Sequence, residues 1–194
     1  MKLDAYIIPS VSMNHSDVPM GSTNGFISKR GYKNSSIQIQ DKVLRERSEL
    51  LLLKDNKILV QRHDEWETGD YKIPGGSTDS GLSVIETAIK ECQEEALITP
   101  MNVRYWGHYC HLFTGKDKVP KWLKNRNQGS FPIDYDGYYT HVCVGLYDKP
   151  YKQKIEEEDQ DAFCKKAKWI LIEEARKFLR EEHIKALDWY LFKP

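Results

Sequence analysis

The segment that decides the fold is residues 75–98, GGSTDSGLSVIETAIKECQEEALI. Within it, Glu91, Glu94 and Glu95 stand at spacings i, i+3 and i+4, which on an α-helix spreads three side chains over roughly 100° of one face. Like charges at this spacing weaken an isolated helix, so the cluster predicts a counter-charge. Carboxylate oxygens are the ligands that hard divalent cations prefer. The turn at Gly75 and Gly76 brings tight backbone close to the cluster, and we expect the chemistry of the chain here.

Residues 83–96 have the clearest helical pattern in the chain. Ser83 is the expected N-cap, and Glu86 three residues later completes a capping box. One apolar stripe is formed by Ile85, Ala88, Ile89, Cys92 and Ala96. The pattern predicts an amphipathic helix that packs on a sheet and presents its three glutamates outward.

The rest of the chain predicts strands and a second helix. The polar, glycine-containing residues 1–40 predict an N-terminal extension with short strands, and residues 41–194 are expected to form the main domain. The expected elements of that domain are a hairpin over 49–60 with its turn at 54–57, strands over 71–76, 103–113, 138–147 and 168–172, and a helix over 173–192. The inner side of the second helix is expected to be Ala175, Phe178, Leu179, Ile184, Leu187 and Leu191. This order of elements predicts a mixed α/β sandwich of the α+β class.

Composition excludes several classes of protein. The chain has 194 residues, of which 40% are hydrophobic, so it fits one domain with extensions. Lys+Arg and Asp+Glu are both 29, so no global field attracts nucleic acid or an anionic membrane. The longest aliphatic run, Leu50 to Leu53, is far too short to cross a membrane, and residues 1–19 lack the apolar core of a signal peptide. Four cysteines without a C-x-x-C pair indicate reduced thiols, so a cytoplasmic location without a membrane partner is expected.

With these features, residues 76–98 resemble the signature of the Nudix hydrolase family, G-x5-E-x7-R-E-U-x-E-E-x-G-U, where U is a bulky apolar residue. The matching positions are Gly76, Glu91, Cys92, Glu94, Glu95 and Ile98. The preceding YKIPGG, residues 71–76, is similar to the entry into the family signature. The resemblance covers about residues 45–175 and implies a Nudix-like α/β/α sandwich around a mixed β-sheet.

The resemblance also implies an activity and its residues. It implies a pyrophosphohydrolase that uses Mg²⁺ or Mn²⁺ and cleaves a nucleoside diphosphate linked to another moiety. The implied metal ligands are Glu91, Glu94, Glu95 and Gly76. The backbone of Gly75 and Gly76 is expected to shape the substrate site. The general base is expected to be one of these glutamates or a residue of the acidic loop 156–161, with Glu157 and Glu158 ranked first; a solvated acidic turn is the alternative for that loop.

Three positions depart from the family pattern: Leu82, Lys90 and Leu97 stand where the family has glutamate, arginine and glycine. Lys90 is expected to act as the orienting catalytic residue by pairing with Glu86 or Glu94, and lysine orients a carboxylate more loosely than the planar arginine fork does. Leu97 is expected to lengthen the helix or change its exit. These departures support an alternative function, a catalytically weakened Nudix-fold module that binds nucleotides or regulates another process.

The substrate is less well defined by the sequence. Residues 116–126 place five basic side chains, Lys121 among them, around Trp122, which suits a polyphosphate tail and a stacked base. An ordinary charged surface loop is the alternative. The candidate substrates are nucleotides, nucleotide sugars, dinucleoside polyphosphates and RNA 5′ ends. Because members of the family are frequently dimers, the resemblance also implies a homodimer as one assembly to test.

Overall fold

The computed structural model describes residues 8–9, 25–27, 33–62, 71–78, 81–113, 135–148 and 167–192. The elements in chain order are β1 (Ile8–Pro9), β2 (Gly25–Ile27), β3 (Lys33–Ile39), β4 (Lys42–Lys54), β5 (Lys57–Val60), β6 (Gly75–Ser77), α1 (Val84–Ala96), β7 (Met101–Leu112), β8 (Gly137–Leu146), β9 (Lys168–Leu171), α3 (Ile172–Ala175) and α4 (Glu181–Phe192). The predicted hairpin is confirmed by β4 and β5. None of the described helices is long and apolar enough to cross a membrane.

The strands of the described residues form one mixed sheet. Its order is β1-β7-β8-β4-β3-β2, while β5 and β6 also pair with β4, and β9 pairs with β5. β4 and β8 run parallel, in register from Leu44 opposite Gly137 to Leu53 opposite Leu146. The other strand pairs are antiparallel. The strands β1 to β3 fall in the predicted N-terminal extension, and the boundary near residue 40 falls in the turn between β3 and β4; the division itself stays a prediction.

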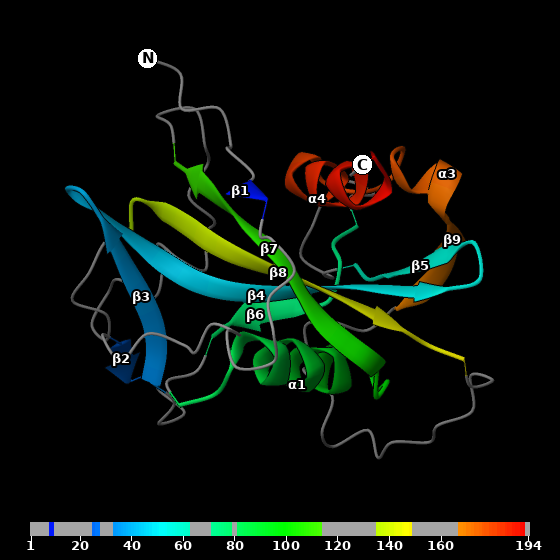
Figure 1. The fold of residues 1–194 in the computed structure, drawn as a ribbon, viewed down its shortest axis with the longest axis horizontal. Helices are drawn as coiled ribbons and strands as arrows, with labels where there is room; N and C mark the ends of the chain where they lie inside the picture. The colour runs from blue at the N-terminus through cyan, green and yellow to red at the C-terminus, as the bar shows by residue number, and fades with distance from the viewer. Residues whose placement is uncertain are drawn as a thin grey trace.

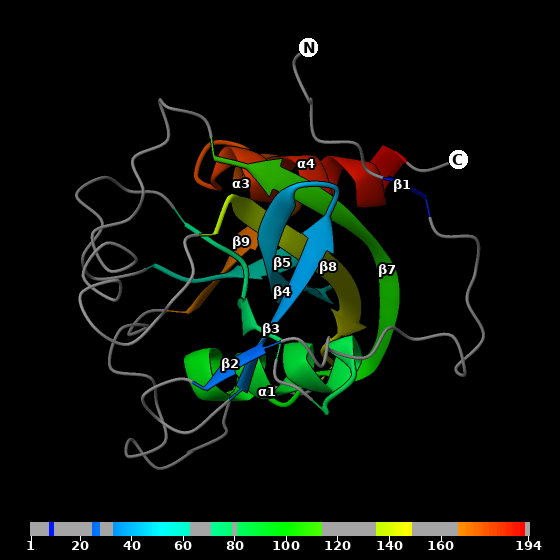
Figure 2. The ribbon, with the colours of Figure 1, turned by 90° about the vertical axis from the view of Figure 1, so that its left-hand side faces the viewer.

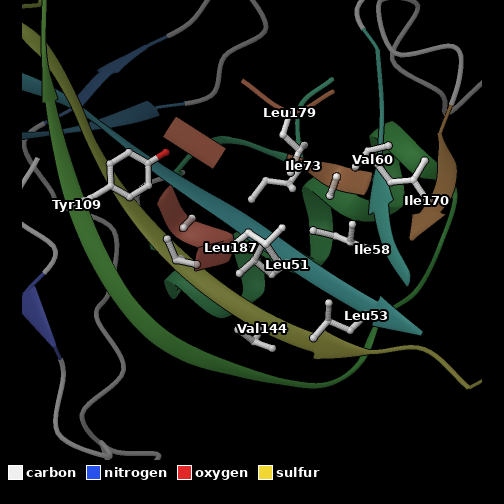
Figure 3. Packing of buried hydrophobic residues seen from close by; sticks show 13 residues of the cluster. Leu51, Leu53, Ile58, Val60, Ile73, Tyr109, Val144, Ile170, Leu179 and Leu187 are labelled. Atoms are coloured by element: carbon white, nitrogen blue, oxygen red, sulfur yellow. The ribbon is translucent and has the colours of Figure 1, made fainter. Parts of the chain in front are cut away.

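Side chains of β4 alternate between two apolar cores. Leu51 and Leu53 pack in a cluster with Leu187 of α4, which is also shown in Figure 3. Leu50 and Leu52 pack in a second cluster with Ala88 and the other inward residues of α1. Figures 1 and 2 show α1 on one side of the sheet and α3 and α4 on the other. The period of two along a strand therefore produces the predicted α/β/α sandwich.

The start of α1 confirms the predicted cap. The Glu86 amide donates to Ser83 Oγ at 3.2 Å, and the Ser83 amide donates to Glu86 Oε2 at 2.7 Å. The helix is not lengthened at its other end, because Leu97 is left-handed (φ 57°, ψ 33°) and its amide donates to the Gln93 carbonyl. Glycine adopts this conformation without penalty, whereas in an L-residue such as leucine it costs about 1–2 kcal/mol.

The prediction of one helix over 173–192 is wrong, because the chain breaks between α3 and α4. The break allows backbone pairing with the segment that leads to the Gly-Gly turn. The Tyr71 amide donates to the Phe178 carbonyl at 2.7 Å, and the Arg180 amide donates to the Tyr71 carbonyl at 3.1 Å. Phe178 and Leu191, which were expected on the inner side, are 39% and 38% exposed. Hydrophobic spacing alone does not reveal a pairing partner a hundred residues away.

A buried carboxylate ties α4 to the sheet. Glu49 of β4 is fully buried, and its Oε2 accepts the Tyr109 hydroxyl at 3.0 Å and lies 3.2 Å from His183 Nδ1. Its Oε1 lies 3.2 Å from Arg47 Nη2. Desolvation by itself would raise the pKa of Glu49, but the charges of His183 and Arg47 outweigh it and lower this pKa to about 2. The network joins β4, β7 and α4.

The low pKa of Glu49 predicts that the fold loses free energy of unfolding in acid. Because its folded pKa lies below its ordinary value of 4.5, its ionisation stabilises the fold above that value, and the contribution disappears as pH falls towards about 2. The contribution is on the order of 3 kcal/mol. We expect Glu49→Gln to flatten the loss of unfolding free energy between about pH 5 and pH 2, measured by urea denaturation. Glu174→Gln, which removes an exposed carboxylate of α3, is the control; equal slopes for Glu49→Gln and the unchanged protein would contradict the assignment.

Candidate functional site

β4 positions both the Gly-Gly turn and the start of α1. In the β4–β6 pairing, Glu49 lies opposite Gly75 and Ser48 lies opposite Gly76. The Ser48 hydroxyl also donates to the carbonyl of Val84, the first residue of α1, at 2.6 Å. Two neighbouring residues of one strand therefore fix the turn and the helix relative to each other.

The two glycines of the turn are required for different reasons. A Cβ on Gly75 would lie 2.6 Å from the Ser48 carbonyl oxygen and 2.8 Å from Glu49 Cα, so the backbone itself occupies that space. A Cβ on Gly76 would lie 2.3 Å from the carboxyl atoms of Glu91. The structure thus brings the predicted residues Gly76 and Glu91 into direct contact, with the carboxylate placed where a side chain would otherwise stand.

Glu95 is enclosed by protein donors, and the prediction that all three glutamates point outward is wrong for this residue. It is only 5% exposed, and its carboxylate pairs with the ammonium of Lys72. Its Oε2 accepts the Gln61 side-chain amide and, at 2.9 Å, the backbone amide of Gly75. The cause is tertiary, since Gln61 and Lys72 lie in a β-bridge beneath α1. The sequence signal for Lys72 was a lysine inside YKIPGG, an otherwise apolar approach to the turn.

Glu91 is half-buried and has a strongly raised pKa. Desolvation and the neighbouring charges of Glu95 and Glu94 raise its pKa to about 8, against the opposing effects of Lys72 and Lys90. Both burial and the neighbouring acids make the ionised form of this carboxylate unfavourable without a bound partner. The position therefore favours a cation or a proton.

Glu94 has 45% of its side chain accessible to solvent. Its carboxylate lies 3.9 Å from the Lys90 ammonium, so the predicted contact of Lys90 with Glu94 is confirmed. The Glu86 carboxylate accepts both the amide and the hydroxyl of Ser83 and serves the helix cap. The Glu86–Lys90 pair stays a prediction.

The carboxylates share a neighbourhood without forming a ready-made metal cage. Among the residues that the structure describes, no group of three His, Cys, Asp or Glu side chains is placed to hold a metal ion. Glu95 is directed at Lys72 and Gly75, Glu94 contacts Lys90, and Glu91 lies against Gly76. The predicted site residues Lys121, Trp122 and Glu158, together with Glu157, lie outside the described residues.

The comparison with protein families decides the identity of this domain. A family model described as the NUDIX domain matches residues 43–190, which is most of the chain. The chain belongs to the Nudix hydrolase family. The match includes the Gly-Gly turn, α1 and nearly all of β4 and α4, so both layers of helices belong to the Nudix domain.

The relatives of this Nudix domain agree on the fold. A nucleoside triphosphate pyrophosphatase/Nudix hydrolase fusion protein of Bifidobacterium longum is 41% identical over 58 residues, which are 29% of this chain and 12% of that protein. The NUDIX domain of Shewanella oneidensis NrtR, complexed with ADP ribose, superposes with a TM-score of 0.57 at 14% identity over 81% of this chain and 90% of that chain. A NUDIX hydrolase from Nitrosomonas europaea superposes with a TM-score of 0.55 at 16% identity over 76% of this chain and 88% of that chain. An Ap4A hydrolase binary complex of C. elegans superposes with a TM-score of 0.52 at 16% identity over 75% of this chain and 94% of that chain. At these identities the solved structures show a shared fold.

Replacing each glycine of this Nudix domain by alanine is expected to cause a different defect. In Gly76→Ala, the methyl group meets the end of a flexible side chain, so we expect an unchanged fold but a displaced Glu91 carboxylate and Mn²⁺ affinity about 10–100-fold lower. In Gly75→Ala, the methyl group meets fixed backbone, so we expect a loss of about 1–3 kcal/mol of unfolding free energy.

Thermal unfolding and Mn²⁺ titration of both variants test this contrast. Gly75→Ala serves as the matched control, because it adds the same methyl group one residue earlier. Full Mn²⁺ affinity in Gly76→Ala would show that the contact between Gly76 and Glu91 has no role in ion binding.

Proposed function

We propose that this chain is a metal-dependent pyrophosphohydrolase that cleaves a nucleoside diphosphate linked to another moiety. The observation that carries the proposal is the contact between Gly76 and Glu91, which places a carboxylate against the backbone of the Gly-Gly turn inside a Nudix domain. The turn supplies backbone without a side chain, and α1 supplies negative charge. Both are needed where a phosphate and a divalent cation meet.

The donor set fits Mg²⁺ or Mn²⁺. Glu91 and Glu94 offer hard oxygen atoms from one helix. Burial, together with the neighbouring acids, raises the pKa of Glu91, so a bound cation would favour its ionised form. Mg²⁺ keeps several waters and needs only a few protein oxygens, so two carboxylates and the Gly76 backbone suffice. When bound, such an ion neutralises phosphate oxygens and lowers the pKa of a coordinated water. Glu95 is the third candidate ligand.

The residues of the chain then have distinct tasks. Gly75 and Gly76 shape the substrate site, because without side chains their turn packs closely against β4 and the Glu91 carboxylate. Lys90 orients Glu94 through their contact at 3.9 Å. One of the glutamates of α1, or Glu158, acts as the general base towards water. Removing a proton from the attacking water requires a carboxylate that is ionised and within hydrogen-bond reach of it.

The relatives support this class of substrate without selecting one member. The names of similar proteins mention nucleoside triphosphates, ADP ribose and Ap4A, each of which contains a nucleoside attached to a chain of phosphates. We therefore keep nucleotides, nucleotide sugars, dinucleoside polyphosphates and RNA 5′ ends as candidates. A cytoplasmic location and a homodimer stay predictions.

A second function is favoured by the Glu95 contacts. Because both oxygens of Glu95 already accept protein donors and Lys90 replaces the family arginine, a Nudix module that binds a nucleotide without rapid turnover is also consistent with the site. Binding without hydrolysis requires the same turn but not a precisely oriented water.

A hydrolysis screen separates the two functions. The protein is incubated with each nucleotide class in the presence of Mg²⁺ or Mn²⁺, and the products are identified by mass after reaction in ¹⁸O-labelled water. We expect release of a nucleoside monophosphate and a loss of about 100-fold in rate for Glu94→Gln, because a candidate ligand is removed.

Lys185→Met, which alters an exposed residue of α4 on the other side of the sheet, is the control and is expected to retain the full rate. No turnover in the whole screen, together with tight binding of one nucleotide, would reject the enzyme and favour the binding module.

A further inference from the structure

Lys72 is a buried cation directly beneath the site. It is only 9% exposed, and its backbone exchanges two hydrogen bonds of 2.9 Å with Gln61 in a β-bridge. The side chains of both bridge partners reach the same carboxylate, that of Glu95. A lysine is rarely this buried unless its charge is paired, so Lys72 and Glu95 form one unit.

The contacts of Glu95 leave little capacity for a metal ion. Oε1 meets the Lys72 ammonium, and Oε2 accepts both the Gln61 amide and the Gly75 amide. An ionised carboxylate has about four lone-pair directions, and these three donors occupy most of them. Binding a cation at Oε2 would break a hydrogen bond that holds the turn.

The other two glutamates are placed differently. Glu94 is half-exposed and close to Lys90, whereas Glu91 lies against Gly76, at the turn itself. The charge of Glu95 is balanced from beneath by Lys72, so the negative charge that faces a divalent ion comes from the other two residues.

We propose that Lys72 is a built-in cation of the site. Its ammonium pairs with Glu95 as a divalent ion otherwise would, so that the ion is bound through Glu91 and Glu94. Glu95 is then a positioning residue that fixes the Gly75 amide, and Lys72 sets how much negative charge the ion meets. The inference rests on the proposed metal-dependent function and adds to it which carboxylates the ion uses.

A charge cycle tests the proposal on the full chain. Mn²⁺ affinity is measured by electron paramagnetic resonance of the free ion in the unchanged protein, Lys72→Met, Glu95→Gln and the double variant. Lys72→Met leaves a surplus negative charge, Glu95→Gln leaves a surplus positive charge, and the double variant removes the pair without changing the net charge. A purely structural role would weaken binding in each variant, or in none.

The expected result is a reversal of sign. We expect Lys72→Met to bind Mn²⁺ about tenfold more tightly and Glu95→Gln about tenfold more weakly, as a nearby unit charge produces on a divalent ion. The double variant is expected to return to within about threefold of the unchanged protein, because the two charge effects cancel. Lys72→Arg keeps the charge and is expected to behave like the unchanged protein. Lys185→Met removes a lysine charge from α4 and is expected to change nothing.

Two results would overturn the proposal. If the double variant binds Mn²⁺ as weakly as Glu95→Gln, Glu95 is a direct ligand whatever Lys72 does. If Lys72→Met and the unchanged protein bind Mn²⁺ equally, Lys72 does not set the charge of the site. Should Lys72→Met fail to fold, the comparison of the double variant with Glu95→Gln still decides.

Failure of the proposed function looks different from failure of this inference. If the proposed function fails while this inference holds, the Mn²⁺ affinities follow the expected order, but the same preparations hydrolyse none of the nucleotides in the screen.

Discussion

The arrangement of this protein depends on the alternation of side chains along β4. Pairing with β3, β5, β6 and β8 leaves this strand little freedom to shift. A shift by one residue would exchange the two apolar cores and would also turn Ser48 away from α1 and Glu49 away from α4. Register in one strand therefore fixes the two helical layers, the Gly-Gly turn and the buried charges at once.

The same residues of the site stabilise the fold and are candidates for the proposed chemistry. By sequence, Glu95 is one of the glutamates of the family signature, but in the structure it connects α1 to Gly75, Gln61 and Lys72. Glu91 keeps a high pKa because it is desolvated beside other acids. On this one helix, Glu95 is neutralised by Lys72, whereas Glu91 and Glu94 are the two carboxylates proposed to bind the ion.

Local signals in the sequence were sufficient for α1 and for the turn. The cap depends on Ser83 and Glu86, which are three residues apart, and the spacing of the glutamates follows from helical geometry. The burial of Glu95 could not be predicted this way, because its partner Lys72 lies 23 residues away on another element. The break between α3 and α4 has the same cause, since hydrophobic periodicity does not report the pairing with Tyr71. The family resemblance supplied the sandwich, but it did not supply the contacts that distinguish this chain.

The pairing of Tyr71 with the segment between α3 and α4 makes the C-terminal part of the chain a support of the site. Segments outside regular helices and strands open locally more often than central strands do. Each such opening of the segment around Phe178 and Arg180 releases both backbone hydrogen bonds of Tyr71, the residue that precedes Lys72. The segment between α3 and α4 thereby supports, from the far side of the sheet, the residue next to the lysine whose ammonium neutralises Glu95.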